Sequence, residues 1–230
     1  VPARLYDDIF IRIAAALFWV PFVFSMWLCS AYSPMPDFSA QLVGEENLRQ
    51  YEDMYAQSSF NRDVATGTAM SGFYQFHNTT IGLRVFAHGL LFGVGGVMET
   101  IHNGAFIGAI FGHMTKVSGG RDNFFQFVTA HGPFELTAII LSAGLGMKLG
   151  FALLFTGGLK RGDSVRLAGQ AAMPAVCVTI LLFALAALIE GYISPSALPY
   201  EIKALFGAGA SALLMIYFAV LGSLGKAYLN

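Results

Sequence analysis

The chain has 230 residues, of which 56% are hydrophobic and only 12% are charged, and its mean hydropathy is +0.62. A soluble domain of this length could not bury so much apolar surface, so the composition predicts an integral membrane protein in contact with the lipid bilayer. The 13 basic and 14 acidic residues nearly balance and form no basic cluster, which argues against a nucleic-acid partner.

The first apolar segment, residues 9–32, predicts a membrane crossing. At about 1.5 Å per residue it is long enough for a hydrocarbon layer of about 30 Å. We therefore assign residues 1–32 to a first transmembrane helix with a cytoplasmic N-terminal flank. The chain opens on Val1 and not on an initiator Met, which we interpret as a cut within a longer native chain.

Residues 33–78 are more polar and begin with the turn-forming sequence Ser33-Pro-Met-Pro-Asp37. Their acidic residues, which outnumber Arg49 and Arg62, are Asp37, Glu45, Glu46, Glu52, Asp53 and Asp63. Because Lys and Arg accumulate on the cytoplasmic side of membrane proteins, this balance predicts an extracytoplasmic helical segment that covers the outer face of the membrane core.

Residues 79–230 are predicted to form a Gly-rich transmembrane core. We expect a crossing at about 81–97, an interruption at 99–103, and a short or re-entrant helix near 104–114. The Gly132-Pro133 pair predicts a break, with a new crossing from 134 to 155, since Pro is tolerated in the first helical turn. Two further crossings are expected at 170–192 and 202–228.

The loop at 157–168 is the most basic short loop, with Lys160, Arg161 and Arg166 against Asp163. The positive-inside rule assigns it to the cytoplasm. Counting from this loop in both directions predicts an all-α, polytopic transmembrane helix bundle with about six crossings and both termini in the cytoplasm.

Glycines recur four residues apart along the predicted core helices. Such small-residue ridges allow helix backbones to approach closely. We expect them to pack helices and to support self-association into a homodimer; they are Gly89, Gly93, Gly104, Gly108, Gly112, Gly146 and Gly150.

Ionisable side chains in a membrane are costly, so they are expected to face the bundle interior and to pair. In the predicted topology His131, Glu135 and Glu190 lie toward outer helix ends, whereas Glu99 and His102 lie at an inner turn. A single site made of all five is therefore not expected. Arg84, near the start of its predicted helix, is expected to extend to the outer surface.

His131 and Glu135 are one helical turn apart, which leaves three interpretations open. They form a hydrogen-bonded pair at a helix start, a metal or proton site, or a catalytic pair. Glu99-x-x-His102 has the spacing of carboxylate-bridged di-metal bundles, but those bundles need the motif twice. No nucleophile-elbow, phosphate-loop, HExxH or paired-cysteine motif is present. We therefore assign no catalytic residue and no cofactor. A divalent metal bound by His131 and Glu135 remains an open alternative.

Five stretches together resemble the stage II sporulation protein M family of integral membrane proteins, from about Arg49 to Pro199. They are Asn78 before a Gly-rich helix, His102-Asn-Gly-Ala-Phe-Ile-Gly108, His131-Gly-Pro-Phe-Glu-Leu-Thr-Ala138, Gly144-Leu-Gly-Met-Lys-Leu-Gly150 and Ala186-Ala-Leu-Ile-Glu-Gly-Tyr-Ile-Ser-Pro195. The resemblance implies that Asn103, His131, Glu135 and Glu190 are family-typical positions, without an established catalytic role.

The resemblance also implies a multi-pass protein of a bacterial or archaeal cytoplasmic (inner) membrane. The family's namesake works with peptidoglycan-degrading partners during engulfment, and its relatives look like membrane partners of AAA+ ATPases. Our first hypothesis is a non-enzymatic scaffold that recruits other membrane or cytoplasmic proteins. The alternatives are a transporter or channel with an intramembrane His/Glu site, and a metal-dependent intramembrane hydrolase.

Overall fold

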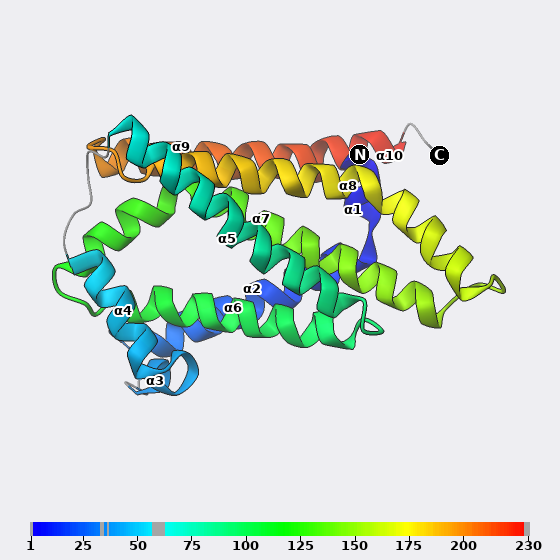
Figure 1. Ribbon diagram of the computed structural model, residues 1–230, viewed down its shortest axis with the longest axis horizontal. Helices are drawn as coiled ribbons and strands as arrows, with labels where there is room; N and C mark the ends of the chain where they lie inside the picture. The colour runs from blue at the N-terminus through cyan, green and yellow to red at the C-terminus, as the bar shows by residue number, and fades with distance from the viewer. Residues whose placement is uncertain (1, 33–34, 36, 57–62, 228–230) are drawn as a thin grey trace.

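A computed structural model describes residues 2–32, 35, 37–56 and 63–227, and every regular element in these ranges is helical, which confirms the all-α prediction (Figure 1). In chain order the elements are α1 (Pro2–Asp7), α2 (Ile9–Cys29), α3 (Phe38–Val43), α4 (Glu45–Ala56), α5 (Val64–Gly89), α6 (Val94–Met114), α7 (Gly120–Leu154), α8 (Arg161–Leu188), the π-helix η1 (Ile189–Ile193), α9 (Tyr200–Met215), the π-helix η2 (Ile216–Val220) and α10 (Leu221–Ala227).

The long helices form a membrane bundle. Within the described residues, four helical stretches are long and apolar enough to cross a bilayer: Ile9–Cys29, Gly120–Leu154, Arg161–Ile193 and Tyr200–Gly225. Helices α5 and α6 lie among them but are less apolar, so the count of six crossings stays a prediction. Both termini and the α7–α8 loop lie toward the end of the bundle opposite α3 and α4 (Figure 1).

The α5–α6 region differs from the sequence-based prediction. Helix α6 is continuous from Val94 to Met114, so the short or re-entrant helix expected near 104–114 is its second half. The chain turns earlier, where Phe92 and Gly93 have φ angles of 53° and 79°. Helix α5 already begins at Val64, so the expected boundary between 33–78 and 79–230 falls inside a helix. Residues 57–62 of the expected acidic segment lie outside the described residues.

Helix α7 also differs, because it continues through Pro133 from Gly120 to Leu154. Proline has no N–H to donate to the carbonyl of Thr129, and such a lost bond bends a helix without ending it. The ribbon of α7 changes direction part-way along its length (Figure 1). The Thr129 carbonyl faces Gly207 of α9, where a Cβ would collide with it. The predicted helix start at Gly132-Pro133 is therefore a bend against which α9 packs.

The glycines lie at close helix crossings inside the chain. Gly104, Gly108 and Gly112 of α6 face backbone carbonyls of α2, at Phe18, Phe22 and Met26. Gly89 of α5 meets the α7 backbone at Gly146 and Gly150, and Gly93 meets the ring of Phe151. A side chain at any of these positions would collide with its neighbour. Contacts within the chain thus occupy the glycine surfaces. The placement of these glycines therefore gives no support to the self-association that we expected from the sequence.

Helix α7 is at the centre of the bundle. Every residue from Ala138 to Met147 is buried, and the apolar ones belong to the main hydrophobic core, which α2, α5 and α8 complete. Burial on all sides explains why this stretch reads as continuously apolar and small, without an amphipathic period.

Candidate functional site

Three ionisable side chains converge between α7 and η1, and we call them the His131 cluster: His131, Glu135 and Glu190. The His131 Nε2 lies 3.6 Å from a Glu135 oxygen and 3.7 Å from a Glu190 oxygen. One ligand atom of each residue lies within 4.8 Å of the others. The side chains are 5%, 17% and 7% exposed, so the cluster is largely removed from solvent.

Local backbone geometry positions Glu190. The α8 helix widens into the π-helical turn η1, a feature that often occurs at functional sites. Gly191 of this turn packs against Ser71 and the Gly67 carbonyl of α5, where a Cβ would collide. The close approach lets Asn78 Nδ2 of α5 donate a hydrogen bond of 2.6 Å to Glu190. Asn78, one of the residues that carry the family resemblance, thus contacts the His131 cluster through Glu190.

A second set of contacts orients the imidazole. His131 Nδ1 lies 3.0 Å from the Ser194 hydroxyl, and this leaves Nε2 facing the two carboxylates. Lys203 Nζ of α9 donates to the carbonyls of Ser194 and Ser196, both at 2.8 Å. Sequence reasoning missed Ser194 and Lys203. The available signals were the position of Ser194 one turn after Glu190 and a lysine in an otherwise apolar segment.

A cavity of about 380 Å³ adjoins the cluster and is lined by all three of its residues. Helix α4 contributes Tyr51 and Tyr55 to its wall, and the Tyr55 carbonyl accepts a hydrogen bond of 2.9 Å from Asn123 of α7. Burial raises the pKa of the Tyr51 hydroxyl, and the nearby charge of Glu135 adds to the effect. Burial likewise raises the pKa of Tyr55. Both phenols therefore stay neutral at physiological pH.

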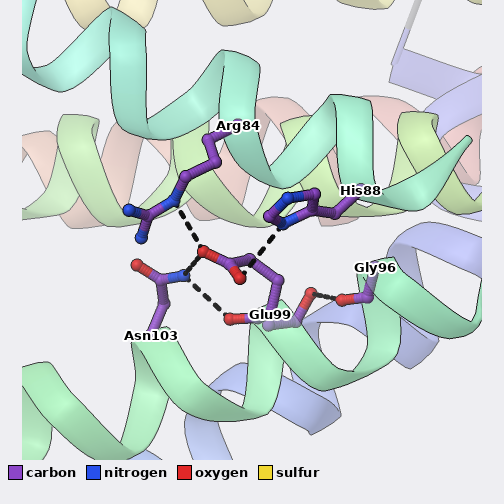
Figure 2. A network of polar contacts seen from close by, with 6 residues as sticks. Arg84, His88, Gly96, Glu99 and Asn103 are labelled. Carbon is purple, nitrogen blue, oxygen red and sulfur yellow. Dashed lines mark hydrogen bonds and ion pairs between the residues drawn. The ribbon is translucent and has the colours of Figure 1, made fainter. Parts of the chain in front are cut away.

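A separate group of polar residues joins α5 to α6, and we call it the Glu99 cluster: Arg84, His88, Glu99 and Asn103 (Figure 2). Glu99 lies 2.8 Å from Arg84 Nε and 3.1 Å from His88 Nδ1. Asn103 Nδ2 donates to the Glu99 carbonyl at 2.8 Å and approaches its carboxylate at 3.4 Å. The carboxylate thus has a fixed cation and several hydrogen-bond donors.

The Glu99 cluster corrects two sequence-based expectations. Arg84 pairs with Glu99 and does not extend to the outer surface, because α5 begins at Val64 and places Arg84 near its C-terminal end. Glu99 belongs to a helix, and the solvated turn expected there is absent from the described chain. Asn103, a family-typical position according to the resemblance, lies in this cluster and not beside His131. His102 is exposed, stacks on Phe106 and joins neither cluster.

The His131 cluster has the donor set of a metal site or of a carboxyl group pair that shares protons. It offers one imidazole nitrogen and carboxylate oxygens from two residues. Within the described part of the chain, neither carboxylate forms an ion pair with Lys or Arg. The Ser194 hydroxyl lies within hydrogen-bond reach of His131, as a nucleophile beside its base would. Ser194 is completely buried, however, so its hydroxyl is placed to support the imidazole and is closed to an external substrate.

Comparison with known proteins identifies one family. The model of that family, described as "Stage II sporulation protein M", matches residues 14–195, a range that includes both polar clusters. No curated protein and no solved structure gives a significant match.

Proposed function

Because the chain belongs to the stage II sporulation protein M family, we propose that it is a multi-pass membrane scaffold that anchors envelope-remodelling partner proteins, linked to peptidoglycan or to AAA+ ATPases. The observation that carries this proposal is the placement of α4. One side of this helix is fixed to the membrane bundle, and its other side presents acidic residues.

Several contacts fix α4 to the bundle. Leu48 is 5% exposed and belongs to a hydrophobic cluster with α6 and α7. Glu52 lies 2.6 Å from His113 Nε2 of α6, and the other nitrogen of His113 lies 3.1 Å from Ser39 of α3. With the bond between Tyr55 and Asn123, these contacts attach α4 along its whole length.

The opposite side of α4 is exposed and acidic. Glu45, Glu46 and Asp53 are all exposed, and Arg49 pairs with Glu45 at 2.9 Å on the same surface. Acidic surfaces steer and orient partners of opposite charge. A rigid acidic helix at one end of a membrane bundle is therefore suited to anchor a partner with a basic surface.

The interior of the bundle also supports a scaffold. Below Glu135, α7 is buried and apolar from Ala138 to Ile140, and burial continues to Met147. The backbones of α5 and α7 meet at Gly89 and Gly146, where a Cβ would have no space. Close packing of this kind opposes a water-filled route through the described core.

The scaffold proposal can be tested by photo-crosslinking in intact cells of the source organism. A photoreactive residue at Glu46 should give discrete protein adducts, whereas one at the lipid-facing position Leu213 of α9, which is 67% exposed, should not. Charge reversal by Glu45→Lys and Asp53→Lys should reduce the Glu46 adducts. Adducts that are absent at Glu46, or that persist unchanged after charge reversal, would contradict the proposal.

A transporter or channel is the second candidate, favoured by the cavity beside the His131 cluster. In this role the cluster would carry a proton or a metal ion across the bundle. Liposomes containing the purified chain should then show flux under an imposed gradient, and Glu135→Gln should abolish it. A wild-type protein without proton or metal flux would eliminate this candidate.

The proposal includes an orientation with both termini and the basic segment 157–168, which contains the first turns of α8, in the cytoplasm. The opposite placement of α3–α4 and the two termini supports it (Figure 1). On a background without native cysteines, a cysteine at Glu46 should react with an impermeant reagent in intact cells. A cysteine at Gly162 should react only after the membrane is permeabilised, and the reverse pattern would invert the topology.

A further inference from the structure

We propose that His131, Glu135 and Glu190 bind one divalent transition-metal ion, with a coordination position left open toward the cavity beneath α4. This inference goes beyond the scaffold function and does not depend on it. It rests on the spacing of the ligand atoms, the orientation of the imidazole, the charge of the cluster and the adjoining cavity.

The spacing of the donor atoms matches a shared metal better than direct bonding. The distances of 3.6 and 3.7 Å from His131 Nε2 to the two carboxylates exceed a hydrogen bond, whose heavy atoms are at most about 3.2 Å apart. Two ligands that each lie about 2.0–2.2 Å from a tetrahedral metal are about 3.3–3.6 Å apart. Since all three ligand atoms lie within 4.8 Å of one another, small side-chain rotations complete the site.

The imidazole is oriented as a ligand. Its Nδ1 contacts the Ser194 hydroxyl, and Ser194 is completely buried. Metal-binding histidines almost always use their second nitrogen in such a supporting hydrogen bond, which fixes the tautomer and aims the other nitrogen at the metal. Lys203 extends this support by binding the Ser194 carbonyl.

The charge of the cluster favours a cation. Two carboxylates face one imidazole in a buried space, and like charges in such surroundings are costly. The amide of Asn78 contacts Glu190 but carries no charge. Lys203 Nζ donates to the carbonyls of Ser194 and Ser196. A bound divalent ion would neutralise both carboxylates directly.

The donor set indicates the class of metal. One nitrogen and two carboxylate groups suit Zn²⁺, Fe²⁺, Mn²⁺ or Co²⁺ better than Ca²⁺ or Mg²⁺, which prefer complete oxygen shells. Three protein ligands with an open position are typical of sites that also bind water or an exogenous ligand. All three residues line the cavity of about 380 Å³, which has room for such a ligand.

Metal binding to the purified full chain tests the proposal. After removal of metals with a chelator, the wild type should bind one Zn²⁺ per chain, measured by mass spectrometry of the metal and by competition with a chromogenic chelator. Glu135→Gln and Glu190→Gln should each weaken binding by more than the roughly 10–100-fold that loss of a supporting contact costs. Glu99→Gln, which alters a partly buried glutamate in the other cluster, should retain wild-type affinity.

Three results would overturn the proposal. The first is a wild type that binds no metal, in which case shared protons would neutralise the cluster. The second is a Glu135→Gln variant that binds Zn²⁺ as tightly as wild type. The third is a Glu99→Gln variant that loses as much Zn²⁺ affinity as Glu135→Gln does. X-ray absorption of the zinc-loaded wild type gives a measurement that needs no variant. Nitrogen and oxygen ligands at about 2.0–2.2 Å are expected, whereas sulfur at about 2.3 Å would assign the metal to Cys29 or Cys177.

Discussion

The Glu99 cluster and the His131 cluster solve the same physical problem in different ways. Both place carboxylates between helices of a membrane bundle, where an unpaired charge is costly. Glu99 has the guanidinium of Arg84 at 2.8 Å, so its charge is balanced by the protein itself. The His131 cluster has two carboxylates and an imidazole without such a pair in the described chain. The first cluster is therefore complete, and the second requires protons or a metal ion.

The two clusters also differ in what they connect. The Glu99 cluster joins α5 and α6, two helices that follow each other in sequence and are linked by a short turn. The His131 cluster joins α7, η1 and, through Asn78, α5, and it adjoins a cavity. A buried carboxylate next to Arg is explained by its contribution to stability, whereas a pair of carboxylates beside a cavity indicates a binding function.

The largest expected effect concerns Arg84. Arg84→Ala leaves the carboxylate of Glu99, which is 16% exposed, without its cation. Losing one partner of a fully buried pair costs about 3–5 kcal/mol, and the half-exposed Arg84 lowers our expectation to about 2 kcal/mol. Unfolding in mixed micelles would measure the loss. The double variant Arg84→Ala/Glu99→Gln should recover part of it, and strictly additive effects would contradict a direct pair.

The next effect concerns the support of His131. Ser194→Ala removes the hydroxyl at 3.0 Å from Nδ1 and should weaken Zn²⁺ binding by about 10–100-fold, as loss of such supporting contacts does. Ser142→Ala, which changes a buried serine of α7 outside the His131 cluster, serves as the matched control and should leave the affinity unchanged. If the Ser194 variant and the wild type bind Zn²⁺ with equal affinity, Ser194 does not contribute to metal binding.

The third prediction is that replacing a glutamate by glutamine changes the stability of the protein in opposite directions in the two clusters. With metal removed by a chelator at neutral pH, Glu135→Gln should stabilise the protein by about 1 kcal/mol, because it removes one of two like charges in a buried space. Glu99→Gln should destabilise it, because Arg84 loses its partner. The free energies of unfolding of both variants provide the measurement. Destabilisation by both substitutions would show that the His131 cluster is as well balanced as the Glu99 cluster.

The smallest effect links the His131 cluster to α4 through Tyr51. Burial and the charge of Glu135 raise the pKa of this phenol, so the folded state favours its neutral form. Its contribution to stability is present below the unfolded pKa of about 10 and is lost as pH rises through the folded pKa. Ultraviolet titration should show late-titrating tyrosines, and Tyr51→Phe should remove one of them, because Tyr55, whose pKa burial also raises, remains.

Glu135→Gln provides the control for that titration. Removing the negative charge should lower the pKa of Tyr51 toward its ordinary value, although burial will keep it raised. Glu99→Gln should leave the titration unchanged. Tyr32→Phe should leave the late component unchanged, because Tyr32 is 93% exposed. If the late component is unchanged in Glu135→Gln, the charge of Glu135 does not affect the pKa of Tyr51.

Local patterns in the sequence predicted part of the fold and of the site. The apolar composition predicted a membrane bundle, because so much apolar surface needs lipid or a core. The spacing of Gly104, Gly108 and Gly112 predicted a close helix crossing, because residues four apart share a helix face. The same spacing rule predicted that His131 and Glu135 would lie together, and the helix carries them on adjacent turns.

Only the tertiary structure decided which partners those local features have. Asn78 and Glu190 are 112 residues apart in sequence and meet because glycines let α5, α7 and η1 approach closely. Helix α7 continues through Pro133 and packs near it against Gly207 of α9, and the pairing of Arg84 with Glu99 depends on where α5 begins. Periodicity along a chain reports which side chains share a face. It does not report which helix covers that face. The covering helix determines whether a buried carboxylate has a basic side chain beside it or needs a bound cation.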